Sequence, residues 1–105
     1  MNEFEYGSEM ERRVAERLRK KGWKVRISPA SRGPYDMEAR KGRRHWLVQV
    51  KATRRPVTFV EKLSTAEREA LIRVADSRRA VPVLALVAKG WIFLLSARRW
   101  RHLHP

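Results

Sequence analysis

The 105-residue chain contains no cysteine, which excludes disulfide bonds and zinc sites built on cysteine thiolates. Long apolar runs are also missing, and the longest, around 81–88, is too short to span a bilayer. The opening residues, Met-Asn-Glu-Phe-Glu, have neither the basic nor the apolar region of a signal peptide. We therefore expect a cytoplasmic protein that has no membrane partner.

Acidic residues are few relative to basic ones. The chain has 11 Asp and Glu against 25 Lys and Arg, so its net charge is +14. Arginine supplies 18 of these cations, and its forked guanidinium suits phosphate better than an ammonium does. A solubility or genome-composition effect is the plain alternative. The charge balance invites a polyanionic partner, which could be DNA, RNA or an anionic membrane surface, and it favours nucleic acid well ahead of that plain alternative.

The length fits one small domain over residues 1–105, and an apolar content of 43% is enough for a globular fold. We place its core at 7–96. The remaining residues, 97–105, form a basic and aromatic tail. A DNA contact, a subunit contact and a frayed end are all compatible with that tail. Its two histidines, His102 and His104, fit solvated side chains better than metal ligands.

Residues 7–21 have the periodicity of an amphipathic helix. Its apolar positions repeat every four residues: Met10, Val14 and Leu18. Ser8 is the expected N-cap, Glu11 completes a capping-box pattern, and Gly22 ends the helix. Glu11 also lies along the apolar stripe, where a carboxylate needs a reason. Capping is one reason and metal ligation is the other, and the sequence leaves both open.

Five segments have the alternation or the apolar content of strands: 23–28, 35–40, 46–53, 81–88 and 91–96. A second helix begins at Ser64, which is followed by acidic residues in its first turn. The order of elements is therefore αβββαββ, an α/β fold. In the segment 35–40, alternation predicts that Tyr35 and Met37 share one face while Asp36 and Glu38 share the other.

The strand at 46–53, Trp-Leu-Val-Gln-Val-Lys-Ala-Thr, carries two polar residues where a plain core strand would carry none. Alternation places Gln49 and Lys51 on the same face. A strand that reaches the surface and exposes its polar end would show the same pattern. A basic turn at 41–44 joins this strand to the preceding one. The resulting hairpin places Asp36 near Gln49 and Lys51 at its open end.

These residues form a candidate site: Glu11, Asp36, Gln49 and Lys51. Hard oxygen ligands suit Mg²⁺ or Mn²⁺, which keep several waters and use one or two carboxylates. A lysine beside such an ion can orient or deprotonate a water, or stabilise charge that builds on a phosphate. The set therefore predicts metal-assisted hydrolysis of a phosphodiester bond, and the positive charge of the chain fits a DNA substrate.

Several basic or hydroxyl side chains near this site are expected to bind DNA. The loop at 29–34 offers Ser31, Arg32 and the backbone of Gly33 to a phosphate, although an ordinary connection would look the same. Arg54 and Arg55 follow the site strand directly. The predicted DNA contacts are Arg12, Ser31, Arg32, Arg54, Arg55 and Lys62.

Asp36, followed after a hairpin by Gln49-Val50-Lys51, resembles the D…(E/Q)xK signature of the PD-(D/E)xK nuclease superfamily. The element order also matches that restriction-endonuclease-like fold, a central mixed β-sheet flanked by helices. Finer features resemble the archaeal Holliday junction resolvases: the first helix with Gly7-x-x-x-Glu11-Arg12, and the ending Lys51-Ala-Thr53. The likeness covers most of residues 7–96.

The resemblance implies a role for each site residue. The metal ligands would be Glu11, Asp36, Gln49 and the carbonyl of Val50. Lys51 would activate the attacking water, and Ser31 would match an active-site serine of the loop. Gln49 replaces the usual glutamate, which removes a negative charge and should weaken metal binding. Some branches of the superfamily, including Mrr-like restriction enzymes, also carry glutamine there.

The sequence therefore predicts an Mg²⁺-dependent DNA endonuclease, with Mn²⁺ able to substitute, that acts on branched DNA such as four-way junctions. Symmetric cutting of two strands implies a homodimer. A restriction or repair nuclease acting on duplex or flap DNA is one alternative. A catalytically inactive DNA-binding module, with Gln49 as a sign of decay, is another. An RNA-binding protein would need exposed stacking aromatics, whereas the tryptophans here fall mostly on strands.

Overall fold

The computed structural model describes residues 1–29, 33–54 and 63–105, which form a five-stranded sheet and two helices. The strands are β1 (Lys24–Ile27), β2 (Met37–Lys41), β3 (Arg44–Thr53), β4 (Val81–Ala88) and β5 (Trp91–Ser96). The helices are α1 (Glu3–Lys20) and α2 (Thr65–Ser77). The predicted αβββαββ order and the α/β class are confirmed.

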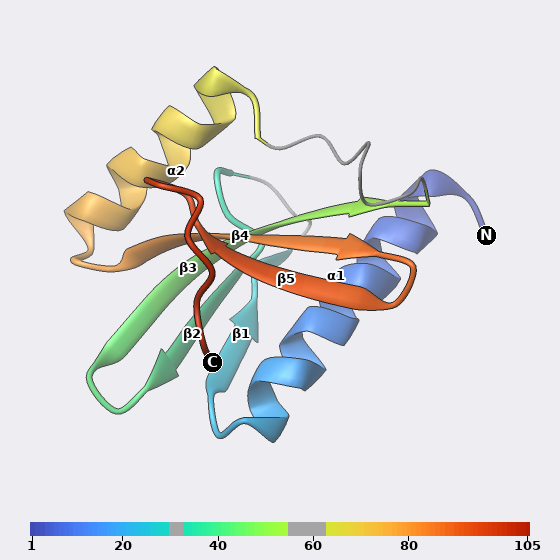
Figure 1. Cartoon of the computed structure of the whole chain (residues 1–105), viewed down its shortest axis with the longest axis horizontal. Helices are drawn as coiled ribbons and strands as arrows, with labels where there is room; N and C mark the ends of the chain where they lie inside the picture. The colour runs from blue at the N-terminus through green and yellow to red at the C-terminus, as the bar shows by residue number, and fades with distance from the viewer. Residues whose placement is uncertain (30–32, 55–62) are drawn as a thin grey trace.

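The strands lie in the sheet in the order in which they occur in the chain, β1 to β5 (Figure 1). Neighbouring strands are antiparallel except for β3 and β4, which are parallel. Parallel neighbours need a long crossover, and α2 lies within the connection between these two strands. The sheet is therefore mixed, as the resemblance implied.

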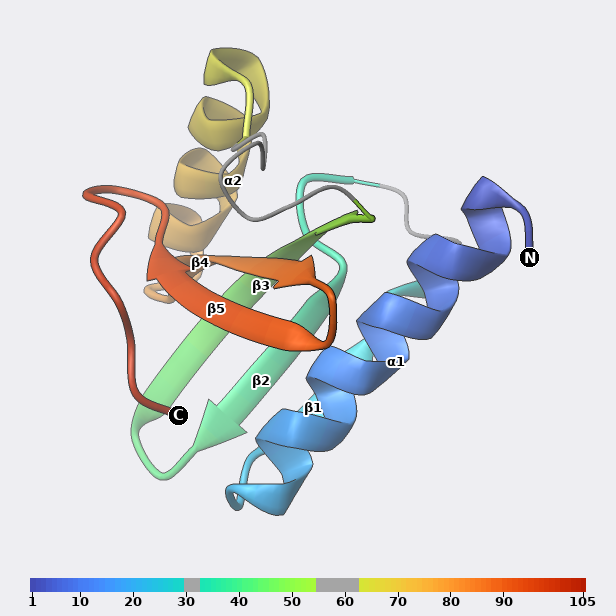
Figure 2. The same cartoon turned by 45° about the vertical axis from the view of Figure 1, so that its right-hand side comes forward.

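The two helices pack on opposite faces of the sheet (Figure 2). On one face, the apolar stripe of α1 contacts the side chains of β3 that point toward it: Trp46, Val48 and Val50. On the other face, α2 packs through Leu71 and Ala75 against Leu47 and its neighbours. The side chains of β3 thus alternate between the two faces as predicted. Gln49 and Lys51 lie on the same face as Leu47, which is the face covered by α2.

Helix α1 begins at Glu3, four residues earlier than predicted. Its N-cap is Asn2, whose side-chain oxygen accepts a hydrogen bond from the Glu5 N–H at 2.8 Å. The helix extends this far because Tyr6 also packs against the core and so lengthens the apolar stripe. The predicted cap at Ser8 is therefore wrong, and Glu11 has no capping role to explain its position.

Strand β2 begins at Met37, so the predicted start at residue 35 is wrong. Tyr35 packs with the cluster beneath α2, whereas Met37 packs on the α1 side. Alternation fails here because the chain bends at Asp36 before the strand begins. The Asp36 backbone remains anchored, since its N–H donates to the Val48 carbonyl at 2.7 Å and its carbonyl accepts from Ser28 at 2.8 Å.

Residues 97–105 are docked against the sheet, which removes the frayed end from the alternatives for this tail. The chain turns back after β5 (Figure 1), and the Leu103 N–H donates to the Leu94 carbonyl at 2.8 Å. The Leu103 side chain packs against the main core. Within the described part of the chain, neither helix is long and apolar enough to cross a membrane.

Candidate active site

Two carboxyl groups from different parts of the chain meet at the open end of the β2–β3 hairpin. Asp36 is only 5% exposed, and its Oδ2 accepts a hydrogen bond from the Val50 N–H at 2.8 Å. Its carboxyl group also shares a hydrogen bond with Glu11 of α1. One member of such a pair must carry a proton in order to donate. The predicted meeting of Glu11 and Asp36 is therefore present in the structure.

The surroundings of Asp36 raise its pKa to about 7. Burial is the largest cause, because it penalises the charged carboxylate, and the neighbouring Glu11 raises the pKa further. The Val50 N–H and the charge of Lys51 lower the pKa, but less than burial and Glu11 raise it. Two acids that hold a proton between them can exchange it for a divalent cation, which satisfies both carboxylates at once.

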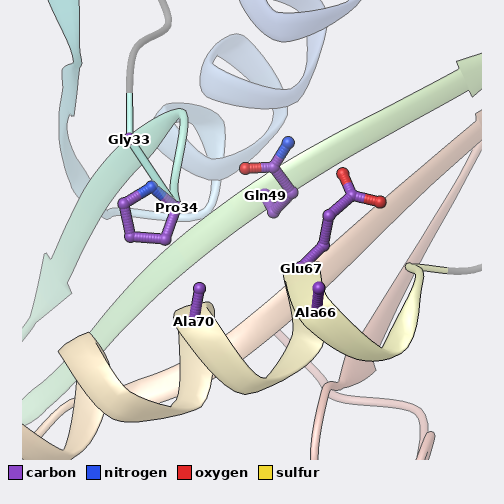
Figure 3. A pocket seen from close by; sticks show the side chains of 6 residues that line it. All are labelled: Gly33, Pro34, Gln49, Ala66, Glu67 and Ala70. Atoms are coloured by element: carbon purple, nitrogen blue, oxygen red, sulfur yellow. The ribbon is translucent and has the colours of Figure 1, made fainter.

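Gln49 belongs to β3, and its side chain lies on the α2 side of the sheet. Its Oε1 is buried and has no hydrogen-bond partner among the described residues. A cavity of about 360 Å³ between β3 and α2 is lined by Gln49 and by Gly33, Pro34, Ala66, Glu67 and Ala70 (Figure 3). A buried amide oxygen without a donor carries an energetic cost that a bound donor or cation would relieve.

The chemistry of the carboxyl pair suits a hard divalent cation. Glu11 and Asp36 supply carboxylates, and Gln49, on the α2 side of β3, offers an amide oxygen that has no hydrogen-bond partner among the described residues. Mg²⁺ is commonly held by one or two carboxylates and keeps waters in its remaining positions. No cluster of three or more His, Cys, Asp or Glu residues able to hold a metal occurs in the described ranges. With an amide at position 49, β3 itself contributes no carboxylate at this end.

Lys51 lies between two acidic residues. Its charge acts on Asp36, and its Nζ lies 2.7 Å from Oε2 of Glu67, in the first turn of α2. The hydrogen bond from Lys51 is the main cause that lowers the pKa of Glu67. The sequence analysis did not include Glu67 among the candidate site residues. The capping pattern from Ser64 fixed its place on the helix, but no local signal showed which strand the helix faces.

The predicted DNA contacts are only partly within the described residues. Arg12 is on the exposed face of α1 and forms ion pairs with Glu9 and Glu16. Arg54, just past β3, stacks on the Tyr6 ring, with its guanidinium carbon 4.2 Å from the ring centroid. The other four lie outside the described residues: Ser31, Arg32, Arg55 and Lys62. All six remain predicted DNA contacts.

A mixed sheet of this order, with a pair of carboxyl groups at the open end of its β-hairpin, is the architecture of a nuclease of the PD-(D/E)xK class. The model of the family described as archaeal Holliday junction resolvase (Hjc) matches residues 2–102 of the chain. Because the match spans nearly the whole chain, the protein belongs to the archaeal Holliday junction resolvase family. The predicted family and fold class are confirmed.

A solved structure supports this family assignment. One similar structure is that of Archaeoglobus fulgidus Hjc, a Holliday junction resolvase from an archaeal hyperthermophile. It is 26% identical to this chain with a TM-score of 0.72, and the alignment covers 88% of this chain and 78% of that one. No curated protein sequence matches the chain. Membership of the family identifies a structure-selective nuclease, and nucleases of this family generally use divalent metal ions.

Proposed function

We propose that the chain is an Mg²⁺-dependent endonuclease that cuts four-way DNA junctions, with Mn²⁺ able to replace Mg²⁺. The carboxyl pair of Glu11 and Asp36 beside Lys51 carries this proposal. Such a pair has little use in a passive DNA-binding surface, because acids repel phosphate and the burial of Asp36 costs desolvation energy. Family membership supports a branched DNA substrate, and an intracellular site of action follows from that substrate.

The residues divide the work of phosphodiester hydrolysis. Glu11 and Asp36 would hold the divalent ion, together with Oε1 of Gln49 and the carbonyl of Val50. When bound, that ion supplies positive charge that polarises the scissile phosphate. Lys51 would orient the attacking water and stabilise the negative charge that develops on the phosphate oxygens. Its position two residues beyond Gln49 on the same strand face keeps the ammonium within reach of the site.

The basic surface of the chain would hold the DNA backbone. A net charge of +14 favours binding of a polyanion through release of counterions. The guanidinium of Arg54 lies at the end of β3, near the candidate site, and is held there by Tyr6 and by Glu3. A homodimer would present two such sites and so allow paired cuts in a symmetric junction.

A cleavage assay on matched substrates tests this proposal. A labelled four-way junction, a flap and a plain duplex of the same sequence are incubated with Mg²⁺, Mn²⁺ or EDTA. Paired and symmetric nicks that occur in the junction alone and require metal are the expected result. Cutting of the flap or duplex as fast as the junction would contradict selectivity for junctions, but the protein would still be a nuclease. Tight binding without cutting in either metal would favour an inactive DNA-binding module.

A further inference from the structure

We propose that Glu67 positions Lys51 for catalysis, in place of the carboxylate that β3 lacks at Gln49. The inference rests on the proposed function, since it assigns a task within the same reaction. Its central observation is the 2.7 Å ion pair between Nζ of Lys51 and Oε2 of Glu67. This pair joins the end of β3 to the first turn of α2, and Glu67 lines the same cavity as Gln49.

The carboxylate of Glu67 is held in place by its own helix. Ser64 and Glu67 form a capping box, in which the Ser64 N–H donates to Oε1 of Glu67 and the Glu67 N–H donates to Oγ of Ser64, each at 3.2 Å. One carboxylate oxygen therefore belongs to the cap, while the other is left for Lys51. A fixed acceptor of this kind limits the positions that a flexible lysine can adopt.

The exposure of the pair indicates a role in positioning rather than in folding. The side chains of Lys51 and Glu67 are 36% and 43% exposed, and ion pairs at such sites add little to stability. The neighbour on the same strand face is Gln49, which is neutral and has no charge to attract the ammonium. Figure 3 shows the Glu67 side chain reaching from α2 toward the strand that carries Gln49. Lys51 is thus held by Glu67 on one side and attracted by Asp36 on the other.

A matched set of variants separates this role from a structural one. Glu67→Gln removes the negative charge, but glutamine at this position can still complete the capping box with Ser64. Glu69→Gln removes an equal charge from an exposed position of the same helix and serves as the control. Glu67→Gln combined with Gln49→Glu moves the carboxylate onto β3, two residues before Lys51. The readouts are kcat on a four-way junction at saturating Mg²⁺, so that a change in metal affinity does not affect the rate, junction Kd in EDTA, and Tm.

For Glu67→Gln we expect kcat to fall between about ten- and a hundred-fold, the usual effect of a mispositioned catalytic group. Its junction Kd should be unchanged or slightly tighter, because an acid that faces phosphate is lost. The double variant should regain most of the rate, and Glu69→Gln should match wild type. Loss of a purely structural residue would instead lower Tm, weaken binding and show no rescue.

Each outcome of the experiment bears on the inference. Full activity of Glu67→Gln in an active wild-type background would overturn it and leave the proposed function standing. A loss of rate that Gln49→Glu does not restore would also overturn it, because the charge near Lys51 would then not be the cause. A wild-type protein that binds the junction but does not cut it would overturn both the proposed function and this inference.

Discussion

The carboxylate of Asp36 accepts a hydrogen bond from the backbone N–H of Val50 at 2.8 Å. This bond joins the entrance of β2 to the strand that carries Gln49 and Lys51, so it fixes the acid relative to the amide and the amine. It also satisfies one oxygen of a nearly buried carboxyl group. The other interactions of that group, with Glu11 and with the charge of Lys51, define the chemistry of the site.

The titration of Asp36 makes stability depend on pH in the absence of metal. Its pKa is about 7 in the folded protein and about 3.9 in an unfolded chain. Its contribution to stability is therefore complete below about pH 4 and is lost as the pH rises through 7. Asp36→Asn does not titrate and can still accept from Val50. Measured in EDTA, it should gain stability relative to wild type between pH 5 and 8, by at most about 4 kcal/mol.

Thermal unfolding from pH 5 to pH 8 provides that measurement. The matched control is Asp76→Asn, which changes the other aspartate of the chain at an exposed position of α2. Its Tm should follow the wild-type curve across this range. A constant offset between wild type and Asp36→Asn at all pH values would contradict the assignment.

Divalent metal should stabilise the wild-type protein, since a ligand that binds only the folded state raises its stability. At a concentration of about 100 times the Kd, the gain is about 2.7 kcal/mol, which is several degrees in Tm for a domain of this size. The shift with Mn²⁺ should disappear in Glu11→Gln. Gln49→Glu adds a third carboxylate and should reach the same shift at roughly ten-fold lower metal. Equal shifts in all three proteins would place the metal elsewhere.

Binding to a four-way junction should depend strongly on salt, because the chain carries a large excess of positive charge. If the complex neutralises six or more phosphates, log K should fall against log salt with a slope of about −5 or steeper. Fluorescence anisotropy in EDTA at several NaCl concentrations measures this slope without cleavage. A flat salt dependence would remove the electrostatic basis for DNA binding.

The docked tail should contribute to stability through Leu103, whose side chain packs against the main core. Leu103→Ala should lower the free energy of unfolding by about 1 kcal/mol, as expected for truncation of a half-buried apolar residue. Chemical denaturation measures the change. The control is His104→Ala, which alters an exposed side chain but keeps the backbone carbonyl that accepts from Arg44. Equal effects of the two substitutions would argue against a packing role for Leu103.

The spacing of apolar residues predicted the helices and strands because it follows directly from which side chains are buried. Alternation along β3 correctly separated Trp46 from Gln49 and Lys51, and the mostly apolar stretch 81–88 is buried on both faces as β4. Lys89 and Gly90, between the predicted strands, both adopt the positive φ that a two-residue hairpin loop requires. The proximity of Asp36 to Lys51, whose charge acts on it, then followed from the hairpin.

Other features depend on contacts that the local sequence does not encode. Ser8 fits a cap as well as Asn2 does, and only the packing of Tyr6 decides where α1 begins. The bend at Asp36 interrupts an alternation that looks regular in the sequence. The contact between Lys51 and Glu67 depends on how α2 crosses the sheet between β3 and β4, which residue spacing alone does not give.

The central claim is that Asp36 belongs to a metal-dependent nuclease site. The most direct test compares wild type and Asp36→Asn on one labelled four-way junction with Mg²⁺, while a gel-shift assay in EDTA measures binding. We predict paired nicks by the wild-type protein, no detectable cutting by Asp36→Asn, and junction affinities that agree within a few-fold. Cutting by Asp36→Asn at the wild-type rate would contradict the account and move the catalytic site away from the carboxyl pair.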